Sequence, residues 1–197
     1  MKVLRAGPAS APNTLVLLHG RGATAESILR LYPELQLGPE WQALAPQAPG
    51  NTWYPYSFLA PLDQNQPFLD QALQTVHGAI GDLPSERVAL LGFSQGACLA
   101  LEYAASHPRR YQAVMALTGG LIRLQHQGDL HETPVFLGSG DPDPHVPFSR
   151  VEESATHLRA LGAQVEVRRY PGLPHTINQD QLNTCRGLLT APKGTLK

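Results

Sequence analysis

The chain has 197 residues and a formal net charge of −1, with 42% hydrophobic and 16% charged residues. This length suits one domain, residues 1–197, and the near-neutral charge excludes a strongly basic surface for nucleic acid or an anionic membrane. No apolar run approaches the roughly 18 residues of a membrane span, and no signal-peptide pattern opens the chain. Two cysteines cannot form a disulfide framework, so we expect a cytoplasmic protein.

Short apolar runs alternate with helical patterns along the chain, without internal repeats. In chain order these predict strand 14–18, helix 23–32, strand 41–45, helix 65–82, strand 87–91, helix 97–105, strands 113–117 and 135–137, helix 151–161, strand 165–169 and helix 177–189. This alternation indicates an α/β fold with a mostly parallel central sheet and helices on both faces. Ligands of such sheets bind at the carboxyl ends of the strands.

One serine stands at the junction between a predicted strand and a predicted helix. Gly92, Ser94 and Gly96 form a G-x-S-x-G pattern directly after strand 87–91. A strand that turns into a helix through one residue holds that residue in a strained conformation, and glycines on both sides avoid collisions. Free N–H groups at the start of the helix also favour an anion. The pattern therefore predicts Ser94 as a nucleophile.

A serine hydroxyl needs a base to take its proton and a carboxylate to orient that base. His175 follows the last predicted strand, in a loop at a carboxyl end. Asp141 and Asp143 follow strand 135–137 and also lie in a loop at a carboxyl end. These residues predict a Ser94–His175 pair with one aspartate, and the choice between the two aspartates stays open.

A serine nucleophile also needs two backbone N–H donors that hold the oxyanion. One is expected from Gln95, the residue after the nucleophile. The other is expected from Arg21, because Gly20 and Gly22 let the loop after the first predicted strand approach closely. We interpret the neighbouring His19 as a structural residue that orients this loop by hydrogen bonds.

Four segments taken together resemble a known family. They are His-Gly-Arg-Gly from residue 19, Gly-Phe-Ser-Gln-Gly from residue 92, Gly-Asp-Pro-Asp-Pro-His-Val-Pro from residue 140, and the Tyr-Pro-Gly-Leu-Pro-His loop from residue 170. From about residue 14 to about residue 190 the chain resembles the carboxylesterase/phospholipase group of α/β-hydrolases, which includes the acyl-protein thioesterases and related bacterial esterases. The order serine, aspartate, histidine is also the order found in α/β-hydrolases.

The resemblance implies an α/β-hydrolase fold without a separate lid domain, and neither a metal nor an organic cofactor. It favours Asp143, the second aspartate of the family pattern, over Asp141. The implied roles are nucleophile for Ser94, base for His175, triad acid for Asp143, and backbone oxyanion donor for Arg21 and Gln95. The implied activity is hydrolysis of carboxylic esters or thioesters with small to medium acyl groups through an acyl-enzyme.

The chain departs from the thioesterases in ways that bear on its substrate. Only 13 residues precede the first confidently predicted strand, so the usual N-terminal strands are expected to be shortened or missing. Arg21 stands where the thioesterases have an apolar residue. Trp53 and Tyr54, in an aromatic loop after strand 41–45, either wall a substrate pocket or pack that loop down.

Two further residues adjoin the predicted triad in sequence. His145 and Leu173 stand near Asp143 and His175, and either contact the substrate or cover the site. With Trp53 and Tyr54, they complete the candidate substrate-binding residues.

Several alternatives stay open. A lysophospholipase or acyl-protein thioesterase would share this site and differ in acyl-chain preference, and a non-catalytic binding protein could keep the fold. A dienelactone hydrolase would have cysteine where Ser94 stands. A metal hydrolase would need His126, Asp129 and His131, which share a polar stretch without a helical ligand motif. Because the fraction of charged residues is low, the formation of a homodimer stays open.

Overall fold

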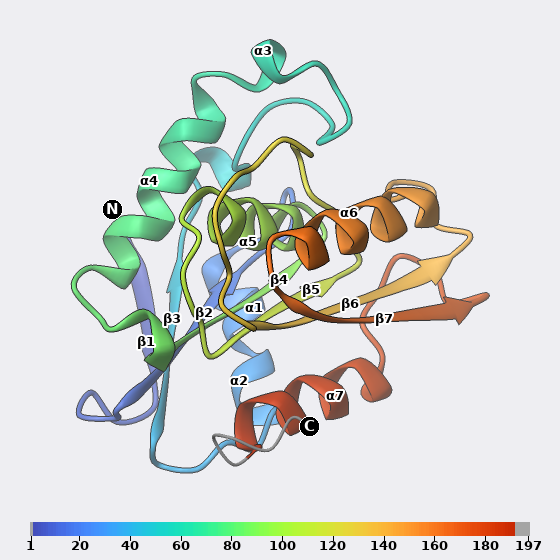
Figure 1. Ribbon diagram of the computed structural model, residues 1–197. Helices are drawn as coiled ribbons and strands as arrows, with labels where there is room; N and C mark the ends of the chain where they lie inside the picture. Colours follow the sequence, from blue (N-terminus) through green and yellow to red (C-terminus); the bar gives the residue numbers. More distant parts are fainter. Residues whose placement is uncertain (1, 192–197) are drawn as a thin grey trace.

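The computed structural model describes residues 2–191, and one sheet runs through this part of the chain (Figure 1). Its strands are β1 (Val3–Ala6), β2 (Asn13–Leu18), β3 (Trp41–Pro46), β4 (Val88–Phe93), β5 (Ala113–Leu117), β6 (Pro134–Asp141) and β7 (Gln164–Pro171). The spatial order is β1-β3-β2-β4-β5-β6-β7, which leaves β1 and β7 at the two edges. All neighbouring pairs are parallel except β1 with β3.

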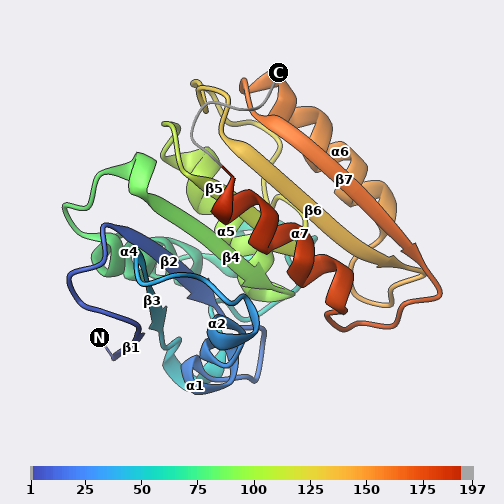
Figure 2. The same cartoon turned by 90° about the horizontal axis from the view of Figure 1, so that it is seen from below.

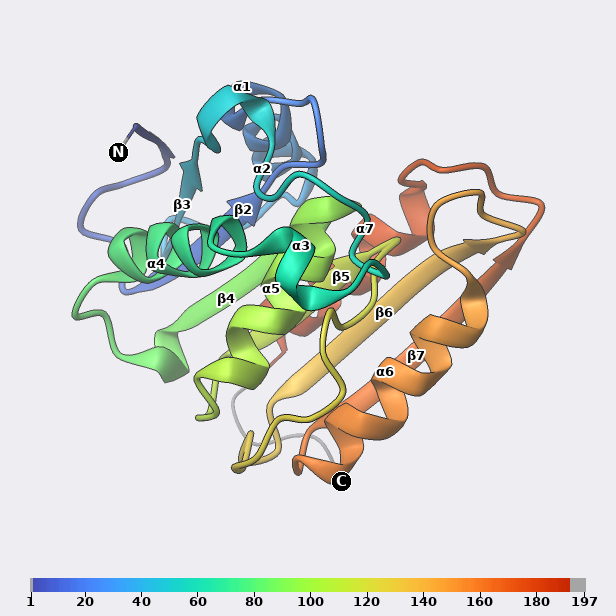
Figure 3. The same cartoon turned by 90° about the horizontal axis from the view of Figure 1, so that it is seen from above.

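Helices cover both faces of this sheet. They are α1 (Ala25–Leu29), α2 (Leu31–Glu34), α3 (Leu62–Asn65), α4 (Phe68–Ile80), α5 (Gln95–Ser106), α6 (Phe148–Ala160) and α7 (Gln179–Thr190), with 3₁₀ turns η1 (Pro49–Asn51) and η2 (Ser85–Arg87). Helices α4, α5 and α6 lie over one face (Figure 3), and α1, α2 and α7 lie over the other (Figure 2). Each face has its own cluster of buried apolar side chains.

The central strands are buried along nearly their whole length, as the continuous apolar runs of the sequence predict. Every residue of β5, and all but the last of β4, is buried. Strands with helices on both sides have no polar face, so their sequences show no alternation. Helix α4 instead buries one stripe of residues, namely Leu69, Ala72, Leu73, Val76 and Ile80, which matches the predicted spacing.

The structure differs from the sequence-based expectation near the N-terminus. The N-terminal strands are expected to be shortened or missing, and one short strand is present that the predicted elements do not include: β1 pairs antiparallel with β3, from Val3 opposite Pro46 to Ala6 opposite Ala43. Four residues are too few for a reliable pattern, and the strand is stabilised by its pairing with β3 and by the packing of Leu4 and Ala6 against a core cluster. The predicted helix 23–32 is instead two short helices, α1 and α2.

The parallel strands bring their carboxyl ends to one rim of the sheet. Leu18 at the end of β2 lies opposite Gly92 near the end of β4, and Asp141 at the end of β6 lies opposite Pro171 at the end of β7. The loops that follow these four strands therefore start from the same rim. They are the loops that carry the residues singled out by the sequence.

Candidate active site

Ser94 occupies a sharp turn between β4 and α5. Its backbone dihedral angles are φ 54° and ψ −119°, and it is the N-cap residue of α5. This is the left-handed region, which strains a residue with a side chain and here turns the hydroxyl out of the sheet end. A Cβ on Gly92 would collide with the carbonyl of Gly96, and one on Gly96 with the carbonyl of Leu18. The two glycines therefore allow the close approach that the turn requires.

His175 lies between Ser94 and Asp143 and contacts both. Its Nε2 lies 2.9 Å from Ser94 Oγ, and its Nδ1 lies 2.8 Å from Asp143 Oδ2. A proton on Nδ1, donated to the carboxylate, leaves Nε2 free to accept the serine proton. The structure thus brings together three residues that lie up to 81 positions apart in the chain.

The Asp143 carboxylate is buried and held ionised. Its side chain is 0% exposed, and burial by itself would raise its pKa. The backbone N–H groups of His145 and Val146, each 2.8 Å from Oδ1, together with His175, outweigh burial and lower the pKa below its ordinary value of 3.8. The carboxylate therefore stays charged and can stabilise a protonated imidazole.

The two aspartates of this loop have different surroundings. Asp141 does not contact His175; its carboxylate lies 3.4 Å from Arg169 at the exposed end of β6. The His175 ring is also flanked by two other rings, Phe93 with a centroid distance of 5.1 Å and His145 at 4.8 Å. These contacts fix the plane of the imidazole in addition to its hydrogen bonds.

The predicted oxyanion donors, Arg21 and Gln95, lie near the serine. Gln95 is the first residue of α5, where the backbone N–H groups have no acceptor within the helix. Arg21 lies in the turn that follows β2, and both residues line the same cavity as Ser94. A Cβ on Gly20 would lie 3.4 Å from Cβ of Ser94, so this turn passes directly beside the serine.

His19 holds the turn after β2, as the sequence interpretation expects. It is fully buried, and its Nε2 accepts a hydrogen bond of 3.1 Å from the backbone N–H of Ala48. Its Nδ1 therefore carries the proton and donates to the Gly20 carbonyl at 2.8 Å. Burial lowers the pKa of His19, so the ring is neutral and acts as a fixed connector between the two loops.

Two polar side chains tie the aromatic loop after β3 to the serine. Gln95 Oε1 accepts from the backbone N–H of Trp53 at 3.0 Å, and Gln95 Nε2 donates to the Tyr54 carbonyl at 2.8 Å. The Arg21 guanidinium donates to the carbonyls of Pro55 and Tyr56, both at 2.6 Å. Sequence reasoning assigns these residues only backbone roles, and the side-chain roles were missed because the hydrogen-bond partners lie 34 to 42 positions away.

A cavity of about 590 Å³ opens next to the serine hydroxyl. Its lining combines the loops after β2, β3, β4, β6 and β7: Arg21, Tyr54, Ser57, Phe58, Leu59, Ser94, Gln95, Cys98, Pro144, His145, Val146, Pro147 and His175. Of the four candidate substrate residues, Tyr54 and His145 line this cavity. Trp53 and Leu173 do not: Trp53 is 3% exposed and packs the loop down, its Nε1 donating to the His19 carbonyl at 2.8 Å.

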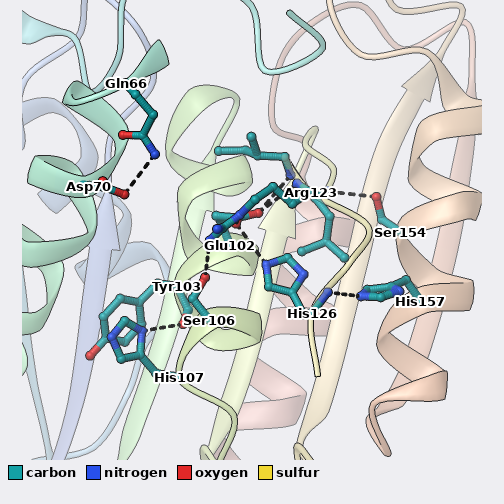
Figure 4. Close-up of polar contacts among 12 residues, drawn as sticks. Gln66, Asp70, Glu102, Tyr103, Ser106, His107, Arg123, His126, Ser154 and His157 are labelled. Carbon is teal, nitrogen blue, oxygen red and sulfur yellow. Dashed lines mark hydrogen bonds and ion pairs between the residues drawn. The ribbon is translucent and has the colours of Figure 1, made fainter. Parts of the chain in front are cut away.

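A second buried polar cluster lies further along α5, two turns beyond the serine. Figure 4 shows Glu102 facing Arg123 and His126, which belong to the loop after β5. The carboxylate is 0% exposed and accepts from the backbone N–H groups of Ile122 and Arg123, from the Arg123 guanidinium, and from His126 Nε2 at 2.9 Å. Burial by itself would raise the Glu102 pKa, but His126 and Arg123 lower it, so the carboxylate is ionised.

The three residues considered for a metal hydrolase serve other contacts. His126 binds Glu102, whereas Asp129 accepts from the backbone N–H of His131 at 2.6 Å. Over residues 2–191, no group of three or more His, Cys, Asp and Glu residues has the geometry to hold a metal ion.

The parallel sheet with helices on both faces, and the serine, histidine and aspartate loops at its carboxyl rim, define the class of α/β-hydrolases. The chain belongs to the phospholipase/carboxylesterase family, whose profile matches residues 2–191. This is a family of hydrolases that act on ester bonds. No helix in the described range is long and apolar enough to cross a membrane.

Several proteins are similar to this chain. A crystal structure of a phospholipase/carboxylesterase from Dyadobacter fermentans is 44% identical, covers 96% of both chains and superposes with a TM-score of 0.92. A probable carboxylesterase, SOBER1-like, from Arabidopsis thaliana is 27% identical over 91% of this chain and 78% of its own length. Acyl-protein thioesterase 1 of Debaryomyces hansenii is 32% identical, but the match covers 51% of this chain and 46% of the thioesterase. The chain thus matches about half the length of that relative.

Proposed function

We propose that the protein is a serine carboxylesterase that cleaves carboxylic esters or thioesters of small to medium acyl groups. The observation that carries this proposal is the position of His175, within hydrogen-bond distance of both Ser94 and Asp143. The phospholipase/carboxylesterase family and the similarity to carboxylesterases support it. The catalytic triad would then be Ser94, His175 and Asp143.

The proposed reaction is acyl transfer to water in two steps. His175 Nε2 takes the Ser94 proton while Oγ attacks the ester carbonyl, and Asp143 stabilises the imidazolium. The N–H groups of Arg21 and Gln95 hold the oxyanion of the tetrahedral intermediate. His175 then gives its proton to the leaving oxygen or sulfur, and the acyl group remains on Ser94. Water, deprotonated by the same imidazole, repeats the attack and releases the acid.

One alternative has a specific observation in its favour. Leu59 lines the cavity and is 47% exposed, so the mouth of the cavity carries an apolar side chain that is open to solvent. A longer acyl chain, as in a lysophospholipid or an acylated protein, could extend across this mouth. The acyl-protein thioesterase among the similar proteins supports the same alternative.

A panel of p-nitrophenyl esters from acetate to dodecanoate, with one acyl thioester, tests these proposals. We expect the highest kcat/KM for acyl chains short enough for the cavity, and a peak at the long chains would favour the lipase-like alternative. Ser94→Ala and His175→Ala should remain folded and lose at least about 10⁴-fold in kcat. A fluorophosphonate probe should label the wild type and leave Ser94→Ala unlabelled. A binding protein on the same fold would show neither turnover nor labelling.

We also propose that the chain acts as a single domain, residues 1–197, in the cytoplasm. One sheet joins β1 to β7, and both core clusters pack against it, which supports one domain. The two cysteines, Cys98 and Cys185, are buried and unpaired, which supports a reducing compartment. Cell fractionation with an antibody against the protein tests the location, and recovery in an extracellular fraction would contradict it.

A further inference from the structure

The side chain of Gln47 joins three segments behind the active-site rim. Gln47 directly follows β3, and its amide contacts the turn after β2, the start of α1 and the loop after β3. Its Oε1 accepts from the backbone N–H of Ala25 at 2.8 Å, and its Nε2 donates to the Ala48 carbonyl and to Asn51 Oδ1, both at 3.0 Å. Gln47 does not line the catalytic cavity, so any effect on catalysis must act through other residues.

The orientation of the Gln47 amide follows from its backbone partners. The Ala25 N–H can only donate and the Ala48 carbonyl can only accept, so the amide oxygen faces Ala25 and the amide nitrogen faces Ala48. The amide nitrogen also lies 3.3 Å from His19 Nε2, and its two hydrogens are shared among three acceptors. The backbone N–H of Ala48 donates to the same His19 atom at 3.1 Å. With two donors directed at Nε2, the His19 proton lies on Nδ1.

His19 in turn holds the peptide group that carries the predicted oxyanion donor. Its Nδ1 donates to the Gly20 carbonyl at 2.8 Å, and the backbone N–H of Ala23 donates to the same oxygen at 3.2 Å. The peptide bond between Gly20 and Arg21 is trans and planar, so the Arg21 N–H points opposite to the Gly20 carbonyl. Fixing the carbonyl therefore fixes the direction of the N–H. Among the described residues, this N–H has no acceptor.

A second restraint acts on the following peptide group. The Gly22 N–H donates to the backbone carbonyl of Asn51 at 2.7 Å. Asn51 has a left-handed backbone conformation with φ 61°, and its side-chain oxygen accepts from Gln47. Gln47 therefore contacts both residues that restrain this turn, His19 before Arg21 and Asn51 opposite Gly22.

We propose that Gln47 is a positioning residue of the oxyanion hole, whose amide holds His19 and Asn51 so that the Arg21 N–H points at the oxyanion. The inference rests on the proposed esterase function, in which that N–H stabilises the tetrahedral intermediate. An oxyanion donor is effective only at about 3 Å and in the right direction. A small displacement of the turn therefore weakens binding of the transition state and leaves binding of the ester almost unchanged.

The variant Gln47→Met tests this role, because methionine has a similar length and no amide. On p-nitrophenyl acetate, kcat should fall roughly 10- to 100-fold, and KM should change by less than about threefold. The loss is smaller than the 10²- to 10³-fold that removal of one oxyanion donor typically costs, because the N–H is displaced and still present.

A pentyl trifluoromethyl ketone gives a readout that a merely structural role would not change. Ser94 Oγ adds reversibly to its carbonyl carbon, the serine proton passes to His175, and the former carbonyl oxygen becomes an oxyanion. The inhibition constant Ki of this ketone should rise in Gln47→Met by about the same factor by which kcat/KM falls. A fall in kcat with an unchanged Ki would overturn the inference.

Gln42→Met is the matched control. Gln42 lies on β3 at the end away from the rim, is 7% exposed and donates to Thr14 Oγ1 at 3.2 Å. Its kcat and Ki should stay within about twofold of the wild type, with urea unfolding to show that both variants are folded. Wild-type values in a folded Gln47→Met, or equal losses in both variants, would overturn the inference while the esterase function stands. A wild type with neither turnover nor inhibition by the ketone would overturn the proposed function as well.

Nitrogen NMR on the wild type keeps the inference testable if Gln47→Met fails to fold. At neutral pH, the His19 ring should carry a proton on Nδ1 and none on Nε2. Burial lowers the pKa of His19, which agrees with a neutral ring. A proton on Nε2 would contradict the inference, because this atom could then accept from neither Gln47 nor Ala48.

Discussion

The carbonyl oxygens of Leu18 and His19 occupy the space that a Cβ on residue 96 would need. Gly96 therefore lets the first turn of α5 pack against the end of β2, and this contact sets the distance between the serine and the turn after β2. At Ser94 the same crowding leaves the backbone in a left-handed conformation. The geometry of the site thus depends on glycine at position 96, which has no side chain, as well as on the side chains of the site itself.

The choice between the two neighbouring aspartates can be tested directly. Asp143→Asn should lower kcat by roughly 10³- to 10⁴-fold, because an amide cannot hold the imidazole in the tautomer with a proton on Nδ1. Asp141→Asn is the matched control: its side chain is 37% exposed and pairs only with Arg169 among its described neighbours. It should change kcat by less than about threefold. Steady-state kinetics on p-nitrophenyl acetate decides, and comparable losses in both variants would refute the assignment.

The Arg21 side chain has a role separate from its backbone N–H. Arg21→Lys keeps the N–H but loses the forked guanidinium that holds the carbonyls of Pro55 and Tyr56. The loop that carries Tyr54 should then move more freely, so we expect KM to rise several-fold with a smaller change in kcat. Arg186→Lys, whose exposed guanidinium contacts Gln36 and Asn183, serves as the control. A fall in kcat at constant KM would indicate instead that the guanidinium acts on the transition state.

At the scale of elements, the loop after β5 is fastened to α5 by one buried carboxylate. Glu102 joins two backbone N–H groups of this loop and the side chains of Arg123 and His126 (Figure 4). The guanidinium of Arg150, on α6, donates two further hydrogen bonds to this loop, to the carbonyls of Leu121 and Ile122. The loop passes beside the wall that Cys98 contributes to the cavity, so this fastening also supports the active-site rim.

Glu102→Gln should destabilise the fold by roughly 3 kcal/mol at neutral pH, because it removes one partner of a buried ion pair. The folded-state pKa of Glu102 lies below its ordinary value of 4.5, so its contribution to stability is fully present above that pH and is lost as the pH falls through the folded value. The difference between variant and wild type should therefore shrink under acid conditions. Urea unfolding at neutral pH and below pH 4.5 measures this difference in the free energy of unfolding.

Glu26→Gln is the control, since Glu26 is exposed and pairs only with Lys2 among the described residues. It should change stability little at either pH. A pH-independent difference for Glu102→Gln would mean that the pKa of the Glu102 carboxyl is the same in the folded and the unfolded protein, which would contradict the ion-pair explanation.

The sequence predicted those elements whose signals are local. The strands β2, β4 and β5 correspond to continuous apolar runs in the sequence. The glycines on both sides of Ser94 indicate the turn there. The features that the sequence did not predict depend on contacts between residues far apart in the chain. The strand β1 exists because β3 offers it an edge, and only the distant bonds from Gln95 decide that Tyr54 rather than Trp53 faces the catalytic cavity.

Glu102 is the clearest case of a residue that local patterns do not explain. Its neighbours in sequence are Leu101, Tyr103 and Ala104, in a helix whose residues are almost all buried. No spacing rule marks it, because its partners lie 20 to 24 positions further along the chain. Sequence reasoning could single out the proposed triad because each of its three members follows a strand, whereas the Glu102 cluster has no such marker.

At the scale of the whole molecule, one sheet separates two cores. Cys98 belongs to the core under α4, α5 and α6, and Cys185 belongs to the core under α7. Burial raises the pKa of each thiol to about 12, so neither forms a reactive thiolate in the folded state. The rate at which a reagent modifies each thiol should therefore report how readily the core around that thiol opens.

An aromatic disulfide reagent should modify neither cysteine of the native protein and both cysteines after denaturation. In the variants Cys98→Ala and Cys185→Ala, the remaining thiol should react slowly and with similar opening free energies, because both cores pack against the same strands. Thiol titration by absorbance under native conditions measures this. A much faster reaction at Cys185 would show that α7 detaches on its own, and that the two cores do not unfold as one unit.

The two edges of the sheet also limit how copies of this chain can associate. The strand β1 offers only four residues. On β7, Arg168 pairs with Glu166 and with Asp180 of α7, and Arg169 pairs with Glu152 of α6. An incoming strand would have to disrupt these ion pairs and bury their charges, so ribbon-like growth from either border is disfavoured. Self-assembly, if it occurs, would have to use helical surfaces.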